Sequence, residues 1–566
     1  MSSAPFCCLR AVSLSCAVLL QASAFGQALP VAVPEPVATT PVAPPAPAFD
    51  ILEFQIEGNS VLTAADIERA VTPFLGENRQ MADVEAARVA LEKVYQGAGF
   101  LTVFVDVPEQ RVDSGVVVLN VTEGRVEWLK VTGSRYFSQG YIRDKVPELA
   151  NGKVPNFNEL QRQLATVNRT EERRVQPIMR AGITPGTVET ELKVDDRLPL
   201  AGSVELSNRA AAATKPLRLS VSAHYDNLFQ LDHSVAVSLS TAPQDVALSR
   251  VFSLNYTIPG DQATWVGYVV NSKSSVAALG DVNVLGKGTT LGLRYVRPLG
   301  SAADEVHSIS LGIDYKDLTE DTRNGDSTIS TPLRYLPLQF AYNASIDHGA
   351  QRQTQMSLQA TAAFRQILQR EVDCPGGRAD QFACKRQGGD GGFATLRADV
   401  RHIVGVAGFG SLHLRLGGQM GTGPVPSGEQ YTIGGAETIR GYYEAEGAGD
   451  RGVLGSIEWR SVDLSGRISR WFGAADSDNS KPAQNALSQS LSQSYALAFV
   501  DVARTYVFEP ATGQAPHTSL AGIGLGLRTK VRKSVTGEFD LAWPLKATSA
   551  TVARSPRAHV KLAVDF

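Results

Sequence analysis

The sequence predicts an all-β, 16-stranded transmembrane β-barrel preceded by two small α+β modules. Three observations support this fold class: an N-terminal apolar segment typical of export, helical patterns confined to residues 49–198, and alternating strand patterns over residues 199–566. A period of two places successive side chains on opposite faces of a sheet, as the wall of a membrane barrel requires. The length of 566 residues also exceeds one ordinary domain.

Composition excludes several classes of protein. Hydrophobic residues make up 43% of the chain and charged residues 20%, so we expect a folded chain and not wholesale disorder. The formal net charge of -3 lacks the basic excess of nucleic-acid binders, and no nucleic-acid partner is expected. No run of eighteen apolar residues follows residue 30, which disfavours a helical membrane protein.

Residues 1–28 are predicted to be a secretory signal peptide. Arg10 precedes the apolar stretch 11–20, and small residues follow at 22–24, before a cleavage site near residues 24–28. The alternative is a short membrane anchor, but this stretch is too short to span a bilayer. Residues 29–48 are rich in Pro and Ala, and because Pro has no amide donor we expect an extended linker.

Two modules of similar pattern follow. The first, residues 49–124, has the order β-α-α-β-β, with strand 51–57, helices 63–74 and 81–96, and strands 101–107 and 115–121. The second, residues 125–198, repeats the order, with strand 126–131, helices 139–149 and 158–167, and strands 175–179 and 187–194. A repeated unit of this size indicates tandem modules.

The predicted barrel occupies residues 199–566. Roughly sixteen alternating segments start near residues 201, 217, 233, 249, 262, 288, 305, 332, 352, 392, 409, 452, 493, 518, 534 and 556. Their even number, their length of about ten residues and their small or polar second face favour a membrane barrel over a large soluble β-sandwich or propeller. Lipid offers no hydrogen-bond partners, so such a sheet must close. Sixteen strands leave a lumen wide enough for water, which would also suit a porin.

Two cysteines remain after the predicted signal peptide. Cys374 and Cys384 flank a stretch with the composition of a loop. An even, closely spaced pair in an exported protein predicts one disulfide that closes a surface loop. A metal site is the alternative, but no His lies nearby and two thiolates do not complete a zinc shell.

Two motifs in the predicted barrel carry a resemblance. Ile439-Arg440-Gly441-Tyr442 lies between the eleventh and twelfth segments, and Phe499 and Asp501 share one face of the thirteenth. Here the chain resembles the outer-membrane transporters of two-partner secretion (TpsB type), the haemolysin secretion/activation family. In that family a V/I-R-G-Y/F loop folds back into the barrel and faces an F-x-D strand.

Physical chemistry supports such a contact. An arginine folded into the lumen needs a partner, because an unpaired buried charge is costly. Asp501 is a natural partner for Arg440, and a bidentate bond would fix the tip of the loop. Gly441 would let the backbone turn or approach the wall. The alternative is a solvated loop arginine and an ordinary lumen aspartate.

The resemblance extends into both modules. Tyr95, Gly99-Phe100, Pro108-Glu109-Gln110 and Glu123-Gly124-Arg125 resemble the first polypeptide-transport-associated (POTRA) module of the family. Asn168-Arg169, Arg173-Arg174-Val175 and residues 182–186 resemble the second. The match covers about residues 49–566. Two departures stand out: the Pro-rich 29–48 stretch is unsuited to the N-terminal plug helix of many members, and residues 465–493 form an insertion where a short periplasmic turn is expected.

The resemblance implies export of another protein. It places the barrel in the bacterial outer membrane and the modules in the periplasm, where they would bind an unfolded exoprotein (TpsA type). The other expected partners are outer-membrane lipid and the barrel assembly machinery. Strands 115–121 and 187–194 are candidates to pair with a strand of the cargo. The alternatives are a barrel insertase or assembly factor of the same superfamily, and a passive porin or an adhesin.

No enzyme activity is expected. The chain has no H-E-x-x-H, G-x-S-x-G or G-x-x-x-x-G-K-[ST] motif, and its eight His residues are scattered. We therefore predict no catalytic residues, no cofactor and no metal site.

Overall fold

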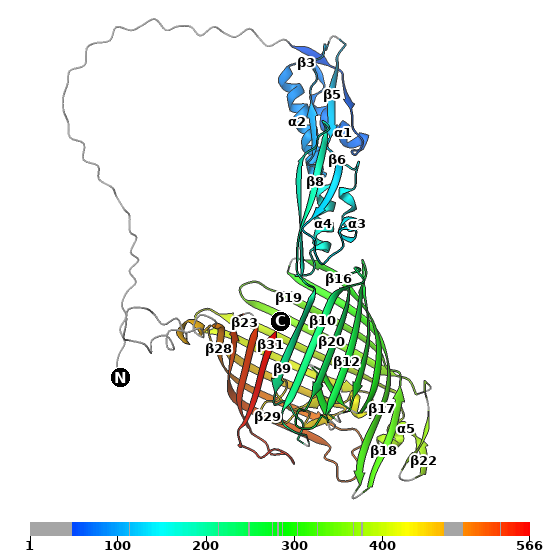
Figure 1. Ribbon diagram of the computed structural model, residues 1–566, viewed down its shortest axis with the longest axis vertical. Helices are drawn as coiled ribbons and strands as arrows, with labels where there is room; N and C mark the ends of the chain where they lie inside the picture. The colour runs from blue at the N-terminus through cyan, green and yellow to red at the C-terminus, as the bar shows by residue number, and fades with distance from the viewer. Residues whose placement is uncertain are drawn as a thin grey trace, which may run out of the picture. The chain divides into compact units, whose positions relative to one another are not determined.

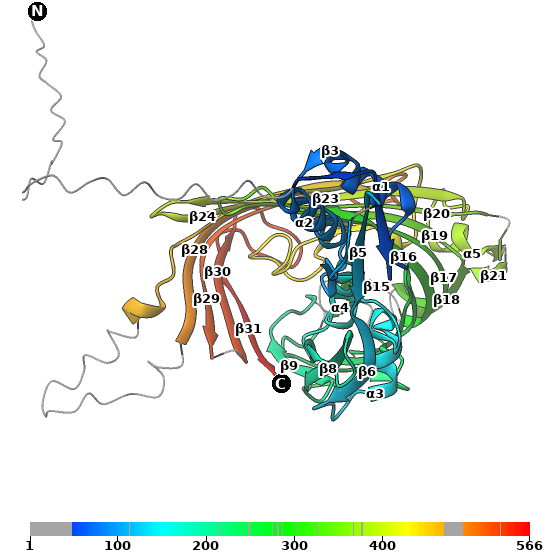
Figure 2. The ribbon, with the colours of Figure 1, turned by 90° about the horizontal axis from the view of Figure 1, so that it is seen from above.

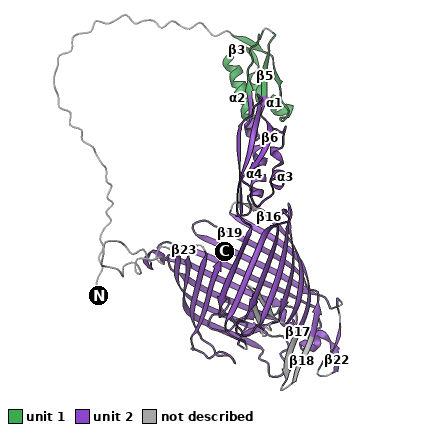
Figure 3. Ribbon diagram, viewed as in Figure 1, with its two compact units in different colours: residues 1–94, 105–121 green, residues 95–104, 122–566 purple. Residues whose placement is uncertain are grey.

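The computed structural model describes residues 48–468 and 491–566, apart from residues 113, 213, 247–248, 274–275, 280–281, 286, 303, 325–326, 366, 369, 375–376 and 533. The predicted signal peptide (1–28), nearly all of the predicted linker (29–48) and residues 469–490 of the insertion at 465–493 lie outside the described residues. The chain divides into two compact units, residues 1–94 with 105–121 and residues 95–104 with 122–566 (Figure 3).

The first module has the predicted order of elements, with two short additional strands, β1 and β3, that pair with each other. Its elements are β1 (Phe49–Ile51), β2 (Glu53–Glu57), α1 (Ala64–Val71), the 3-10 turn η1 (Thr72–Phe74), β3 (Gly76–Arg79), α2 (Met81–Gly97), β4 (Val103–Asp106) and β5 (Val116–Glu123). Thr63 caps α1, because its hydroxyl accepts the Asp66 amide at 3.3 Å. Val84 and Leu91 of α2 and Leu119 of β5 are buried in the module core.

The second module repeats this plan. Its elements are β6 (Arg125–Thr132), α3 (Gln139–Asp144), η2 (Pro147–Leu149), α4 (Phe157–Val167), β7 (Arg173–Ala181) and β8 (Thr187–Asp196). The predicted helix 139–149 is divided into α3 and η2, since Pro147 has no amide hydrogen to continue the helix. Asn156 caps α4 by accepting the amides of Asn158 and Glu159 at 3.0 and 3.3 Å.

The sheet order corrects one expectation. The two strands expected to pair with a cargo, 115–121 and 187–194, correspond to β5 and β8. These are the middle strands of their sheets, which run β2-β5-β4 and β6-β8-β7. A middle strand has both rows of backbone groups paired, so neither β5 nor β8 has a free edge. Periodicity identifies a strand but not its place in the sheet.

The C-terminal part is a closed antiparallel barrel of sixteen strands, as predicted (Figure 1). The strands are β9 (Leu200–Ser207), β10 (Arg218–Leu228), β11 (His233–Thr241), β12 (Arg250–Pro259), β13 (Thr264–Ser272), β16 (Lys287–Ala302), β17 (Glu305–Asn324), β18 (Ser327–Tyr335) continued by β19 (Leu338–Asp347), β20 (Arg352–Ala363), β23 (Phe393–Val406), β24 (Gly410–Gly421), β27 (Arg451–Arg460), β28 (Leu491–Tyr506), β29 (His517–Val531), β30 (Val535–Pro544) and β31 (Arg557–Asp565).

One strand of the barrel wall is interrupted: β18 and β19 are its two pieces, and they are counted as one strand. β18 pairs with the C-terminal part of the long strand β17 (residues 316–324), and β19 pairs with its N-terminal part (residues 305–313). The break between them contains Pro337, which cannot donate to the ladder. The barrel closes where β31 pairs with β9, for example Leu562 opposite Leu206.

The two faces of the wall differ in polarity. Large apolar side chains are exposed on the outside, including Leu206, Leu239, Phe252, Leu293, Leu311, Phe340, Leu416, Ile457, Val502, Leu525 and Leu562. The inside carries serine pairs such as Ser203–Ser222 at 2.8 Å and ion pairs such as Arg294–Asp314 at 2.7 Å. This is the arrangement of a membrane barrel with a wet lumen. Among the described residues, no helix is both long and apolar enough to span a bilayer.

Smaller elements lie between the wall strands. They are the hairpin β14 (Val276–Leu279) and β15 (Val282–Leu285), the hairpin β21 (Glu371–Cys374) and β22 (Gly377–Asp380), α5 (Gln381–Lys385), η3 (Ser427–Glu429), and the hairpin β25 (Tyr431–Ile433) and β26 (Gly447–Gly449).

Candidate functional site

The segment between β24 and β27 folds into the barrel. We call residues 422–450 the lumen loop; it contains η3 and the hairpin β25–β26. Figure 2 shows this yellow segment inside the ring of strands. A tight turn at Gly434 and Gly435, with φ of 104° and 105°, reverses the chain ahead of the predicted motif. Thr438 closes the turn, because its hydroxyl accepts the Gly434 amide at 2.8 Å.

Arg440 at the tip of this loop binds Asp501 on β28. Its Nε donates to Asp501 Oδ2 at 2.8 Å, and its Nη2 donates to Oδ1 at 3.0 Å. The Arg440 backbone amide also donates to Oδ2 at 3.2 Å. The side chains of Arg440 and Asp501 are only 7% and 1% exposed. The geometry is therefore the bidentate type that gives an arginine–carboxylate pair its strength and direction.

A second carboxylate and an aromatic ring complete the arginine's surroundings. Arg440 Nη1 donates to Glu458 on β27 at 2.5 Å, and Arg460 donates to the other oxygen of Glu458 at 2.7 Å. The Arg440 guanidinium lies 3.3 Å from the centre of the Phe499 ring. Two cations thus face two carboxylates, so the buried cluster is balanced in charge.

Gly441 and Tyr442 dock the loop on the opposite side of the tip. The Gly441 amide donates to His559 Nε2 on β31 at 2.9 Å, which fixes the His559 proton on Nδ1. Gly441 has a φ of 98°, a conformation that favours glycine. The Tyr442 hydroxyl accepts the Lys546 amide at 3.1 Å and lies 3.0 Å from the Ala521 carbonyl.

Apolar packing and small residues in the wall let the lumen loop lie close against the inner face of the barrel. Ile439 and Tyr442 are fully buried in one cluster with wall residues Leu454, Ala503 and Leu520. A Cβ placed on Gly522 of β29 would lie 2.1 Å from the Arg440 carbonyl oxygen. A side chain at position 522 would therefore displace the loop.

The tip of the loop borders a polar cavity of about 670 Å³. Arg440, Glu437 and Thr438 of the loop line it, together with charged wall residues that include Arg401, Arg528, Glu538 and Lys561. The lining also includes Gln493, Lys530 and Thr536, which lie near the ends of strands on the side where the barrel turns face the second module. The loop thus stands between this cavity and the outer end of the barrel.

The structure brings all six residues of the two predicted motifs together. Ile439, Arg440, Gly441 and Tyr442 lie against the wall, and Phe499 and Asp501 both contact Arg440. Sequence reasoning missed Glu458, Ser456, His559 and Gly522. Ser456 donates to Asp501 at 2.6 Å. In the sequence, each of these four residues is marked only as a polar or small residue on the inner face of a predicted strand. Many other positions have the same property, so it could not single them out.

Cys374 and Cys384 form a disulfide with a Cα–Cα distance of 5.7 Å. It lies in the segment between β20 and β23, outside the wall strands. Among the described residues, no group of three or more His, Cys, Asp or Glu side chains is arranged to hold a metal ion.

Comparisons with known proteins agree with this architecture. The family model described as haemolysin secretion/activation protein ShlB/FhaC/HecB matches residues 186–460, and the model of the ShlB-type POTRA domain matches residues 49–124. The outer membrane transporter CdiB of Escherichia coli is 22% identical over 231 residues, and CdiB of Dickeya dadantii (strain 3937) is 21% identical over 440 residues.

These alignments cover different shares of the relatives. The match spans 39% of this chain and 39% of the Escherichia coli relative, and 74% of both chains for the Dickeya dadantii relative. Among solved structures, CdiB from Escherichia coli has a TM-score of 0.57 at 18% identity, covering 94% of this chain and 93% of the other. BamA from Haemophilus ducreyi lacking POTRA domains 1–3 has a TM-score of 0.52 at 12% identity, covering 92% and 100%. These structural likenesses show the fold.

Proposed function

We propose that the chain is a transporter of the haemolysin secretion/activation protein family ShlB/FhaC/HecB, whose model matches residues 186–460, and that it carries an exoprotein out of the cell by two-partner secretion. The barrel lies in the outer membrane and the two modules lie in the periplasm. The modules bind the unfolded cargo, and the barrel lets it pass. The family is one of transporters, which points to transport and not to catalysis.

The observation that carries the proposal is the pinned lumen loop. Arg440 and Asp501 hold the lumen loop inside a closed barrel. A passive porin needs only a constriction, whereas a polypeptide channel needs an obstacle that moves aside and returns. An ion pair between a loop and a wall suits that task, because cargo groups or water can replace each partner's bonds when the loop shifts.

Recognition of the cargo is assigned to an edge of the second module. Its free edges are β6 and β7. β7 contains Pro177, which lacks an amide donor, whereas β6 contains no proline. We assign cargo pairing to β6, since an extended chain can add to it through backbone bonds and tolerate varied sequence. A photo-crosslinker at exposed Lys130 on β6 should capture cargo, and one at exposed Gln176 on β7 should capture much less.

The defining experiment is depletion of the protein. Loss of one or a few large exoproteins from the medium, with the outer-membrane proteome unchanged, is the expected result. Broad loss of outer-membrane barrels would instead identify an insertase. A change in small-solute permeability alone would identify a porin.

The Arg440→Ala variant tests the loop's role. It should insert into the membrane at wild-type levels and secrete the cargo poorly. The matched control is Arg401→Ala, another lumen arginine, whose side chain is 51% exposed and binds Asp399 on its own strand. Secretion at wild-type levels by the Arg440→Ala variant would remove the loop from the mechanism.

A further inference from the structure

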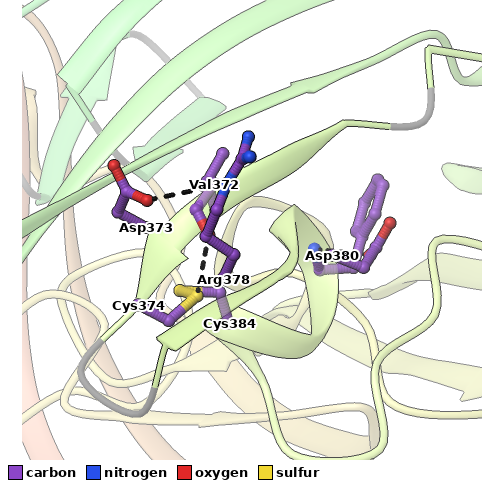
Figure 4. Close-up of a disulfide and its surroundings, with 7 residues drawn as sticks. Val372, Asp373, Cys374, Arg378, Asp380 and Cys384 are labelled. Atoms are coloured by element: carbon purple, nitrogen blue, oxygen red, sulfur yellow. Dashed lines mark hydrogen bonds and ion pairs between the residues drawn. A yellow bond between two sulfur atoms is a disulfide. The ribbon is translucent and has the colours of Figure 1, made fainter.

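The disulfide closes a compact element at the outer end of the barrel. We call residues 371–374 and 377–386 the clasp; it consists of the strands β21 and β22, the helical turn α5 and Arg386. Figure 4 shows Cys374 at the end of β21 joined to Cys384 on α5, so that the hairpin and the turn fold back on each other. Asp380 starts the turn by accepting the Phe382 amide at 2.9 Å.

The clasp contacts the wall through α5. Gln381 is fully buried and is bonded to the backbone of β18: its Oε1 accepts the Arg334 amide at 2.9 Å, and its Nε2 donates to the Arg334 carbonyl at 2.8 Å. These bonds anchor the clasp to the barrel. They also set the position of the next residue, Phe382.

Phe382 packs against the N-terminal part of the lumen loop, which we call its first arm (residues 422–430). It is buried in a cluster with Tyr335 of β18 and Val425 of the loop. The Phe382 and Tyr335 rings meet edge to face with centroids 5.9 Å apart. The Tyr335 hydroxyl in turn donates to Glu429 of the loop at 2.9 Å, and Lys316 binds the same carboxylate at 2.5 Å.

Arg386 binds the C-terminal part of the lumen loop, which we call its second arm (residues 447–450). Its Nη2 donates to Asp450 at 2.5 Å and to the Phe508 carbonyl, between β28 and β29, at 3.1 Å. Asp450 is completely buried. Its carboxylate also accepts the backbone amides of Val425 at 3.1 Å and Phe508 at 2.6 Å, and the Gln430 side chain at 3.3 Å.

One buried carboxylate therefore joins three outer segments. The donors to Asp450 come from the clasp, from the lumen loop itself and from the segment after β28. Among these donors only the Arg386 guanidinium is charged, and a buried carboxylate depends on such a partner. Both ends of the lumen loop are thus tied to other segments of the chain, at contacts separate from those of Arg440.

We propose that the clasp is a second, outer hold on the lumen loop, with Arg386 and Phe382 as its positioning residues. The inference rests on the proposed function for its importance to transport. Arg440 fixes the tip of the loop, and the clasp fixes its two arms. The disulfide keeps the clasp folded, because a lone two-stranded hairpin is marginally stable in water. Opening the pore requires both holds to yield.

The test measures the pore without any cargo. Purified full-length protein is inserted into a planar lipid bilayer, and the open probability at fixed voltage is recorded. Arg386→Ala should raise the open probability several-fold over wild type, and Arg386→Lys should recover much of the closed state, because a single cation can still reach Asp450. The control is Arg378→Ala in the same clasp, since that side chain is 70% exposed and forms a long, 3.8 Å ion pair with Asp373.

Reduction provides an independent arm of the same experiment. Dithiothreitol exchanges with the disulfide, leaving two thiols on the chain and one cyclic disulfide on the reagent. Its addition should raise the open probability of wild type to the level of Cys374→Ser/Cys384→Ser, and it should leave that double variant unchanged. Folded wild-type mobility on an unheated gel checks that each variant is an intact barrel.

The outcomes separate this inference from the proposed function. Wild-type open probability in Arg386→Ala, or no response of wild type to the reductant, would overturn the clasp. Raised open probability with normal secretion would keep the clasp as a hold on the pore. Loss of secretion on depletion is measured separately and decides the proposed function by itself.

Discussion

Arg440 and Asp501, 61 residues apart in the chain, form a buried bidentate ion pair inside the barrel, with contacts of 2.8 and 3.0 Å. The pair does not stand alone, because Glu458 binds the same guanidinium at 2.5 Å. A loop and two neighbouring wall strands, β27 and β28, are thereby joined at one point.

Loss of Arg440 should loosen the loop and destabilise the barrel. In Arg440→Ala, Asp501 loses its bidentate partner while Glu458 keeps Arg460, and breaking a buried pair from one side costs about 3–5 kcal/mol. A lower unfolding temperature in detergent and a higher pore conductance are expected. Arg440→Lys should not restore either value, because one ammonium group cannot bridge both carboxylates. An unchanged unfolding temperature in both variants would contradict the buried pair.

A single methyl group at position 522 should push the loop from the wall. The Cβ of Gly522→Ala would lie 2.1 Å from the Arg440 carbonyl oxygen, which is backbone and cannot move alone. We expect higher pore conductance and protease cleavage within residues 422–450. The matched control is Gly455→Ala on β27, whose Cβ would meet Val502 at an ordinary 3.7 Å. Equal behaviour of the two variants would show that the loop does not rest on this wall position.

Asp232 should tie the second module to the first turn of the barrel. Arg173 of the module is 1% exposed on its side chain and donates to Asp232 at 3.1 Å, and the Tyr141 hydroxyl donates to the same carboxylate. Asp232→Ala removes the carboxylate partner of the buried Arg173 cation and leaves it the Val167 carbonyl and the Phe137 ring, at a cost of about 3–5 kcal/mol. Hydrogen exchange should accelerate at residues 227–232 and in α3. Glu171→Ala, whose side chain is 93% exposed, is the control and should leave exchange unchanged.

Acid should loosen the turn between β7 and β8. Hydrogen bonds from the Thr187 and Thr184 hydroxyls lower the pKa of Glu127, with help from the Thr184 and Ile183 amides. A carboxyl with a lowered pKa stabilises the fold above its unfolded pKa of about 4.3 and loses that contribution as pH falls through its folded pKa. Amide exchange at Ile183 and Thr184, corrected for intrinsic rates, should therefore rise below about pH 4.

The Glu127→Gln variant provides the comparison for this pH dependence. It cannot ionise, so its exchange at the same two amides should be faster than wild type at neutral pH and should show no acid-dependent step. A step of equal size in the variant would assign the titration to another group.

Local patterns identified most of the elements. The alternating segment predicted to start near residue 217 corresponds to β10, which begins at Arg218, because burial against lipid on one face imposes period two along the strand itself. The helix at residues 81–97 was visible for the same reason at helical spacing. The break at Pro147 was missed because a helical pattern extends past it, although proline ends the amide ladder.

Other features are set by pairing between distant segments. That β5 and β8 are middle strands follows from sheet order, which no single segment encodes. The sequence alone determined the barrel, the two modules and the residue types at the tip of the lumen loop, because these follow from periodicity and from the needs of a charge placed in a lumen. Only the tertiary structure decided that Glu458 and His559 complete the contact and that Arg386 reaches Asp450. Hydrogen bonds act over about 3 Å, and only the closed barrel brings such distant residues within that range.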